Sequence, residues 1–288
     1  MMAALLSHAV VLLGLCSLCH PVCGFSTTDL LRQLSLTSRP TRVATPQSTT
    51  VRFSSAAATE DSIIAVDETN ARSVFGTKDY WDDVYLGRGD FPADCYTWYY
   101  GWEVLGRIIE EFAPKTTKPR ILIPGIGNDS ILLDLYKAGY RNLVGQDYSE
   151  HAVERQIDLL SYEGIPRNLG EANPGDVDNG QFVQILQGDV TNLPPSWSDD
   201  QFDVILEKGL LDAVYLSGDG NVEAAVQNLQ RVLRRGGLVI SVSGVVPRDL
   251  RKSLFVASES KQQGPGTWEW LKDGSDDLKA GCFVMKKG

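Results

Sequence analysis

Residues 120–128 read Arg-Ile-Leu-Ile-Pro-Gly-Ile-Gly-Asn, and this stretch decides the fold. Its apolar beginning predicts a short buried strand that stops at Pro124. Gly125 and Gly127 follow, and glycines allow the backbone to turn tightly and to approach a ligand closely. Residues 129–138 then show apolar side chains at helical spacing. The stretch therefore reads as a strand, a glycine turn and a helix.

The same alternation of strands and helices continues downstream. The expected strands are 142–146, 182–186, 202–206 and 238–242, and the expected helices are 150–162, 221–233 and 249–255. Alternating strands and helices predict the α/β class, with a Rossmann-like doubly wound sheet that is covered on both faces. A final strand pair over 267–271 and 282–286 brings the number of strands to seven. Residues 163–180 are rich in Gly, Pro, Asn and acids and predict an exposed, mobile loop, and 234–237 predicts a turn.

Acidic residues end the second and third strands of this predicted sheet. On such sheets, ligands bind at the carboxyl ends of the strands. Asp147 follows Gly127 by 20 residues, and an acid there can accept hydrogen bonds from both hydroxyls of a ribose. Asp189 could accept from an exocyclic amine such as that of adenine, and the amides that begin the first helix favour a carboxylate or phosphate. The strand ends therefore predict a pocket for an adenosine with a charged tail.

Two cofactor classes use such a pocket. Dinucleotide enzymes carry the pattern Gly-x-Gly-x-x-Gly, in which the third glycine lets the helix pack closely on the strand. Here Ser130 stands at the position of that third glycine. The helix and strand pair after the fifth strand also fit a methyltransferase sheet. Both points favour S-adenosylmethionine over NAD, and an NAD-type oxidoreductase stays as an alternative.

The charge of the chain limits its partners. The formal net charge is −10, but residues 1–59 carry four Arg against Asp29 alone, so the remainder carries −13. An acidic domain lacks the basic field that nucleic-acid binding needs, so we expect a small molecule or a basic, lysine-bearing protein as substrate. After residue 59 the chain has two cysteines, Cys95 and Cys282, and one histidine, His151. A metal site built from several histidines is therefore excluded, and we expect no metal.

The N-terminal part of the chain has the composition of a targeting segment. Residues 1–24 resemble a signal peptide, because an apolar core shorter than a bilayer span is followed by small residues. Residues 25–59 are rich in Ser, Thr and Arg, as transit peptides are. Together they resemble the bipartite leader of proteins sent to complex plastids, with a secretory signal or a mitochondrial presequence as alternatives. We expect a linker over 60–78, one domain over 79–288, and no stable membrane insertion after processing.

Five blocks of residues carry a resemblance to a known family. They are Tyr-Trp-Asp-Asp-Val-Tyr at 80–85, Tyr-Thr-Trp-Tyr at 96–99, the glycine turn at 121–128, Gln-Asp-Tyr-Ser at 146–149, and Phe-Asp-Val-Ile-Leu-Glu-Lys-Gly-Leu-Leu-Asp-Ala at 202–213. From about residue 79 the chain resembles the methyltransferase-like group of class I S-adenosylmethionine-dependent methyltransferases that contains the elongation-factor and citrate synthase lysine methyltransferases. The resemblance implies a seven-stranded, mostly parallel sheet with an antiparallel last strand, and a protein lysine as acceptor.

The resemblance also implies roles for matching positions toward S-adenosylmethionine. The cofactor would be covered by Trp81, Tyr85 and Trp98. Its ribose and adenine would be held by Asp147, Tyr148, Asp189 and Val190. Its amino-acid end would lie at Gly125, Gly127 and Lys208. The chain departs from the family at Ile126, where a cysteine is usual, in the apparent insertion at 163–180, and after Val246.

Two acids at the end of the fourth strand are candidates for the chemistry. A lysine must be neutral to attack a methyl group, and Glu207 or Asp212 could orient it and take part in its deprotonation. Asp212 could equally cap or pack locally. A small-molecule methyltransferase on the same fold and a non-catalytic cofactor-binding module stay as alternatives to a protein lysine methyltransferase.

Overall fold

The computed structural model describes residues 71–169, 183–259, 268–273 and 281–288. The signal-like segment 1–24, the transit-like segment 25–59 and most of the expected linker lie outside the described residues, so these assignments stay predictions. Within the described ranges, no helix is long and apolar enough to cross a membrane.

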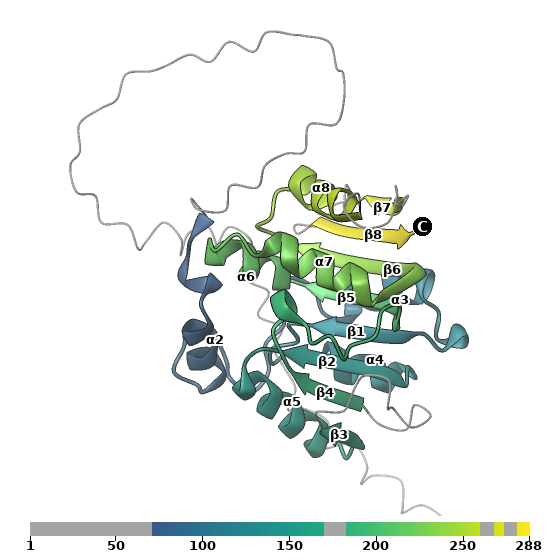
Figure 1. The fold of residues 1–288 in the computed structure, drawn as a ribbon. Coiled ribbons are helices and arrows are strands. Elements are labelled where there is room, and N and C mark those ends of the chain that lie inside the picture. The colour runs from purple at the N-terminus through teal and green to yellow at the C-terminus, as the bar shows by residue number, and fades with distance from the viewer. Residues whose placement is uncertain (1–70, 170–182, 260–267, 274–280) are drawn as a thin grey trace, which may run out of the picture. The chain divides into compact units, whose positions relative to one another are not determined.

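The described strands form one eight-stranded sheet in the order β3-β4-β2-β1-β5-β6-β8-β7 (Figure 1). Neighbours pair in parallel from β3 to β6, whereas β8 runs antiparallel to both β6 and β7. The seven-stranded, mostly parallel sheet predicted from sequence is thereby confirmed, and β3 extends its edge. The strands are β1 Arg120–Pro124, β2 Asn142–Asp147, β3 Arg167–Leu169, β4 Val183–Gln187, β5 Phe202–Lys208, β6 Leu233–Ser243, β7 Trp268–Asp273 and β8 Gly281–Lys287.

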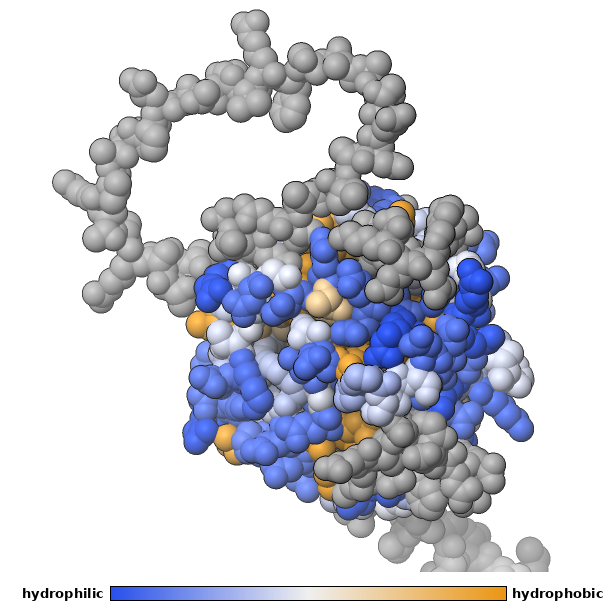
Figure 2. Space-filling model, in the orientation of Figure 1, coloured by the Kyte–Doolittle hydropathy of each residue, from blue (hydrophilic) through white to orange (hydrophobic). Residues whose placement is uncertain are grey.

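Helices cover both faces of the sheet, as strand alternation requires. In β1, Ile121 and Ile123 join a core with α3, α4 and α5, whereas Leu122 joins the opposite core with α6, α7 and α8. The helices are α2 Lys78–Tyr85, α3 Trp102–Phe112, α4 Ile131–Ala138, α5 Glu150–Tyr162, α6 Leu210–Ser217, α7 Val222–Val232 and α8 Arg248–Glu259. The face drawn in Figure 2 is largely hydrophilic, with hydrophobic residues scattered among polar ones.

Local sequence signals explain where several helices begin and end. Ser149 precedes α5 in an extended conformation, and its side chain accepts a hydrogen bond from the Ala152 backbone nitrogen. Gly139 ends α4 with a left-handed φ of 105°, which a residue without a Cβ adopts readily. By contrast, α2, α3 and α6 were not among the helices expected from the sequence.

Two segments differ from the expectation. The predicted turn at 234–237 lies inside β6, because the chain bulges out of the ladder there: Phe202 pairs with Leu233, but Val204 pairs with Leu238. Within the expected loop at 163–180, residues 167–169 instead form β3, which pairs with β4. Residues 170–180 of that loop lie outside the described residues.

The end of the expected linker is folded rather than extended. Residues 74–76 form the short 3-10 helix η2 (Val74–Gly76), which packs against α6. The backbone nitrogen of Ser73 donates to the Leu216 carbonyl at 2.8 Å, and Arg72 pairs with Asp219 at 2.6 Å. The folded part of the chain therefore includes residues 72–78, ahead of the expected start at 79.

Replacing Gly76 with alanine tests this packing. A Cβ there would lie 2.1 Å from the Ser217 backbone nitrogen, so Gly76→Ala must displace η2 from α6. We expect the free energy of unfolding to fall by about 1–3 kcal/mol, as for other overpacked sites, measured by chemical denaturation. Gly188→Ala is the matched control, because its Cβ would make only an ordinary contact at 3.8 Å. Equal stability of both variants would contradict the packing of η2.

Candidate functional site

The carboxyl ends of four neighbouring strands meet at one edge of the sheet. In the ladder, Pro124 of β1 lies beside Gln146 of β2, and Asp147 lies beside Gln187 of β4. On the other side, β5 lies next to β1 and runs in the same direction. The fold thus brings together the loops that follow β1, β2, β4 and β5, which carry the strand-end residues predicted to bind a cofactor.

The turn after β1 depends on its two glycines. Gly125 and Gly127 have φ values of 62° and 54°, in the left-handed region that favours glycine. The fully buried side chain of Gln156 braces the turn, because its Nε2 donates to the carbonyls of Gly127 at 2.9 Å and Asp129 at 2.8 Å. Sequence reasoning missed Gln156, although a polar residue on the inner face of an amphipathic helix was a signal for it.

Asp147 is held rigidly at the end of β2. One carboxylate oxygen accepts from the Gly127 backbone nitrogen at 2.9 Å, and the other accepts from that of Ser149 at 3.0 Å. A carboxylate has about four lone-pair directions, so acceptor capacity for a ribose remains beyond the backbone donors Gly127, Ser149 and Tyr148. Burial raises the pKa of Asp147 to about 6, although the backbone hydrogen bonds oppose this shift.

The predicted adenine residues follow β2 and β4. Tyr148 is half-buried, and its backbone carbonyl accepts from Gln187 Nε2 at 3.3 Å. Asp189 is exposed, and one of its oxygens accepts from both the backbone nitrogen and the hydroxyl of Thr191 at 2.8 Å. Val190 is buried directly after it. An exposed acid beside an apolar side chain suits an aromatic base with an exocyclic amine.

Lys208, at the end of β5, is an interior ion-pair partner. Its Nζ lies 2.6 Å from Asp129 Oδ2 and donates to the Trp98 carbonyl at 2.7 Å. Both side chains of the ion pair are at least 90% buried, at 6% and 7% exposed. Lys208 therefore fixes the loop after β1 and the segment around Trp98, so it shapes the amino-acid end of the predicted pocket through these neighbours.

The aromatic residues predicted to cover the cofactor form one connected cluster. Trp81 and Tyr85, both on α2, are stacked with ring centroids 6.2 Å apart, and Trp81 contacts the Trp98 ring edge-on at 5.7 Å. Tyr85 lies over the glycine turn, since a Cβ at Gly127 would be 2.9 Å from its hydroxyl. The structure thus brings the aromatic group to the same strand ends as Asp147.

The arrangement fits S-adenosylmethionine. A buried carboxylate with spare acceptor capacity lies beside a turn that requires glycine, and aromatic rings lie above that turn. The ring faces suit a cationic sulfonium. Which of these side chains touch the cofactor stays a prediction.

Glu207 and Asp212 are both occupied by structural hydrogen bonds. Glu207 is fully buried and accepts from the Leu211 backbone nitrogen at 2.9 Å and from the Ser241 hydroxyl at 2.6 Å. Burial raises the pKa of Glu207 to about 7. Asp212 accepts from five donors, which are the hydroxyls of Tyr99 and Ser243 and the backbone nitrogens of Gly244, Val245 and Val246. Both carboxylates hold the ends of β5 and β6 in place, and a direct part in proton transfer stays a prediction.

Tyr99 is a site residue that sequence reasoning missed. Its φ of 62° is rare for a bulky side chain, and such strain often accompanies functional sites. Its hydroxyl donates to Asp212 at 2.5 Å, and its ring packs against Gly209 and Gly244, where a Cβ would lie 3.3 Å and 2.6 Å away. Tyr99 therefore joins the aromatic cluster to the loops that follow β5 and β6.

Comparison with known proteins agrees with this geometry. The chain matches the family model described as a methyltransferase domain over residues 122–241. EEF1A lysine methyltransferase 2 of Danio rerio is 32% identical over 184 residues, covering 61% of this chain and 72% of that protein. Protein-lysine N-methyltransferase EFM4 of Saccharomyces cerevisiae is 29% identical over 191 residues, covering 59% and 76%.

Other relatives are much longer than this chain. The eEF1A lysine and N-terminal methyltransferase homolog of Drosophila melanogaster is 27% identical over 176 residues, which cover 60% of this chain but 23% of that protein. The chain therefore matches less than a quarter of the length of this relative.

The pKa of Asp147 predicts a pH dependence of cofactor binding. Ribose hydroxyls donate to the ionised carboxylate, so affinity for S-adenosylmethionine should fall as the pH drops through about 6. We expect the Kd from calorimetry to rise about tenfold per pH unit well below that pKa. Asp147→Asn should bind weakly with no such slope, and a constant Kd for the unaltered protein between pH 5 and 7 would contradict the assignment.

Glu207 predicts a pH dependence of stability. Its folded pKa of about 7 lies above the ordinary value of 4.5, so its contribution to stability is complete below pH 4.5 and is lost as the pH rises through 7. Glu207→Gln should therefore show a shallower decline of unfolding free energy between pH 5 and 8, measured by denaturant titration. The exposed Glu223→Gln is the control and should keep the original slope. Identical slopes for the two variants would refute the role of Glu207.

Proposed function

Because the chain belongs to the class I S-adenosylmethionine-dependent methyltransferases that include the EEF1A lysine methyltransferases, we propose that it methylates a lysine side chain of a protein. The observation that carries this proposal is the match to EEF1A lysine methyltransferase 2, of which the chain covers 72% at 32% identity. The choice of lysine as acceptor rests on what this relative and the yeast protein are named for.

S-adenosylmethionine supplies an activated methyl group on a sulfonium when it is bound. We assign its ribose to Asp147, its adenine to Tyr148, Asp189 and Val190, and its amino-acid end to the loop after β1. Trp81 and Tyr85 would exclude water from the side of the cofactor that carries the sulfonium. Without water there, the methyl donor and its acceptor stay in position for the transfer. The chain's main contribution is thus to align donor and acceptor.

The acceptor side is assigned to the ends of β5 and β6. Tyr99 donates its proton to Asp212, so the lone pairs of its oxygen can accept a hydrogen bond from an amine. Burial keeps the pKa of Tyr99 far above its ordinary value, so it stays a neutral phenol. Such an acceptor would orient a neutral lysine amine, while Asp212 and Glu207 hold the loops in place.

The charge of the domain supports a basic protein partner. Residues 60–288 carry a formal charge of −13. Several acids on α2 and in the loop after it are exposed, namely Asp79, Asp90 and Asp94. A surface of this kind attracts a lysine-bearing segment and raises its rate of association.

Methyl transfer to a protein tests the proposal directly. The full chain is incubated with deuterated-methyl S-adenosylmethionine and an elongation factor 1A protein, and peptides are analysed by mass spectrometry. We expect the label on a lysine side chain. Asp147→Ala should lose about a hundredfold in cofactor affinity, because two charge-assisted hydrogen bonds are removed, and transfer should fall with it.

Two results would overturn the lysine assignment. One is transfer to small molecules of a metabolite extract with no label on protein lysines, and the other is saturable cofactor binding with no transfer to any acceptor. The first result would identify a small-molecule methyltransferase on the same fold. The second would identify a non-catalytic cofactor-binding module.

A further inference from the structure

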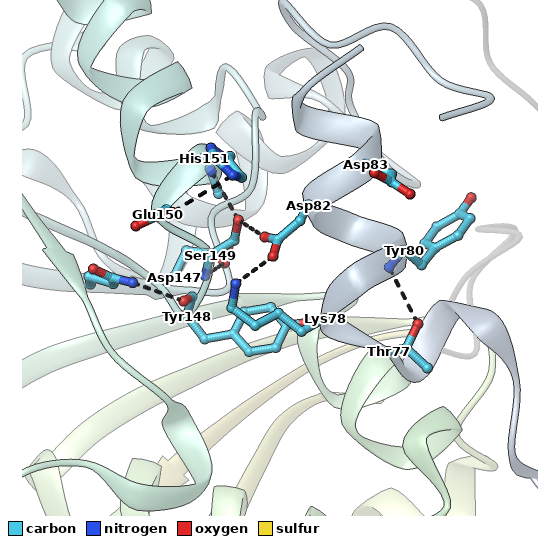
Figure 3. Close-up of polar contacts among 12 residues, drawn as sticks. Thr77, Lys78, Tyr80, Asp82, Asp83, Asp147, Tyr148, Ser149, Glu150 and His151 are labelled. Carbon is cyan, nitrogen blue, oxygen red and sulfur yellow. Dashed lines mark hydrogen bonds and ion pairs between the residues drawn. The ribbon is translucent and has the colours of Figure 1, made fainter. Parts of the chain in front are cut away.

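A partly buried polar contact joins α2 to Ser149, the residue that caps α5. The hydroxyl of Ser149 donates to Asp82 Oδ1 at 2.5 Å, and Nζ of Lys78 lies 2.5 Å from Asp82 Oδ2. Figure 3 shows the Asp82 side chain reaching from α2 toward Ser149, with the Lys78 ammonium beside it. The same ammonium lies 5.8 Å from the centroid of the Tyr148 ring. We call the Lys78–Asp82–Ser149 contact the latch.

Ser149 connects the latch to the ribose-binding carboxylate. Its side chain is fully buried, and its hydroxyl oxygen also accepts from the Ala152 backbone nitrogen at 3.3 Å. Its own backbone nitrogen donates to Asp147 at 3.0 Å. One residue therefore caps α5, supports Asp147 and holds α2 through Asp82.

The latch is one of several contacts that hold α2. The apolar contact between α2 and α5 is a small cluster whose buried members are Val84, Tyr85 and Ala152. A further polar link runs from Arg155 Nε to the Tyr85 carbonyl at 2.8 Å. Ring contacts of Trp81 with Phe75 and Trp98 hold the same helix. Because the latch touches α2 and the cap of α5 but neither α3 nor α7, its loss should loosen α2 more than it loosens the rest of the domain.

We propose that the latch sets the affinity for S-adenosylmethionine by holding α2 closed over the strand ends. Tyr85 covers the turn at Gly127 and Trp81 stacks on Tyr85. Both residues lie on α2, so they keep these positions only while α2 stays in place. The apparent affinity of a ligand falls with the fraction of protein in the binding-competent state. By reciprocity, bound cofactor stabilises the closed position of α2. Asp82 is thus a positioning residue that acts through α2 and Ser149.

Asp82→Ala tests the latch, with a matched control on the same helix. Asp83 is the next residue, is exposed and pairs with Arg88 rather than with α5. In the full chain we expect Asp82→Ala to weaken the calorimetric Kd for S-adenosylmethionine about tenfold, as for a lost hydrogen bond to a charged group. Asp83→Ala should stay at the original Kd. Asp82→Asn, which keeps an acceptor for Ser149, should fall between the two.

Hydrogen exchange of the cofactor-free protein separates a positioning role from general destabilisation. We expect faster exchange in Asp82→Ala for the amides of α2, with no change in α3 or α7, and slower exchange of α2 in the unaltered protein when cofactor is added. An unchanged Kd in Asp82→Ala would overturn the proposal. Exchange that rises equally in α2, α3 and α7 would also overturn it, because the effect would then be global.

A second variant keeps the test decisive if Asp82→Ala does not fold. Lys78→Met removes the ammonium from the latch but leaves the hydrogen bond between Ser149 and Asp82. Because Lys78 is on the solvent side, with 45% of its side chain exposed, we expect a smaller loss of roughly twofold to fivefold in affinity. An affinity equal to that of the unaltered protein in this variant would count against the latch.

Discussion

The buried carboxylate of Asp147 is the interaction on which the rest of the site depends. It accepts backbone hydrogen bonds from the loops after β1 and β2, so a single side chain sets the relative positions of both strand ends. The glycine turn, the cap of α5 and, through Ser149, the position of α2 all follow from it. Burial of a carboxylate is unfavourable unless its oxygens are bonded, and here that requirement keeps the surrounding backbone ordered.

Buried polar side chains extend the same principle to the ends of β5 and β6. Asp212 binds three consecutive backbone nitrogens of the loop after β6, and Glu207 binds the backbone at the start of α6. The interior ion pair between Lys208 and Asp129 joins the end of β5 to the loop after β1. The strand ends are therefore connected by charges whose partners are fixed, and this pre-organises the pocket before a ligand arrives.

The sheet could be predicted from the sequence because its signals are local. Short apolar runs located β2, β4 and β5 to within one or two residues, and Gly125, Gly127 and Asp147 lie at the strand ends where they were expected. The contacts between Tyr99 and Asp212, 113 residues apart, and between Asp82 and Ser149, 67 residues apart, could not be predicted. They depend on how a strained backbone and a separate helix pack onto the finished sheet, and no periodicity in the sequence encodes that packing.

The antiparallel strand β8 affects how the chain folds. It inserts between β6 and β7, and its side chains alternate between the two cores: Cys282 and Val284 enter one, whereas Phe283 and Met285 enter the other. A nascent chain cannot complete either core until residues 281–287 have left the ribosome. The β6–β8 ladder pairs Leu238 with Lys286, a long-range contact of the kind that slows folding. During synthesis the edge of β6 and apolar surface on both faces stay exposed, so this protein has a long interval in which chaperones or aggregation can act on it.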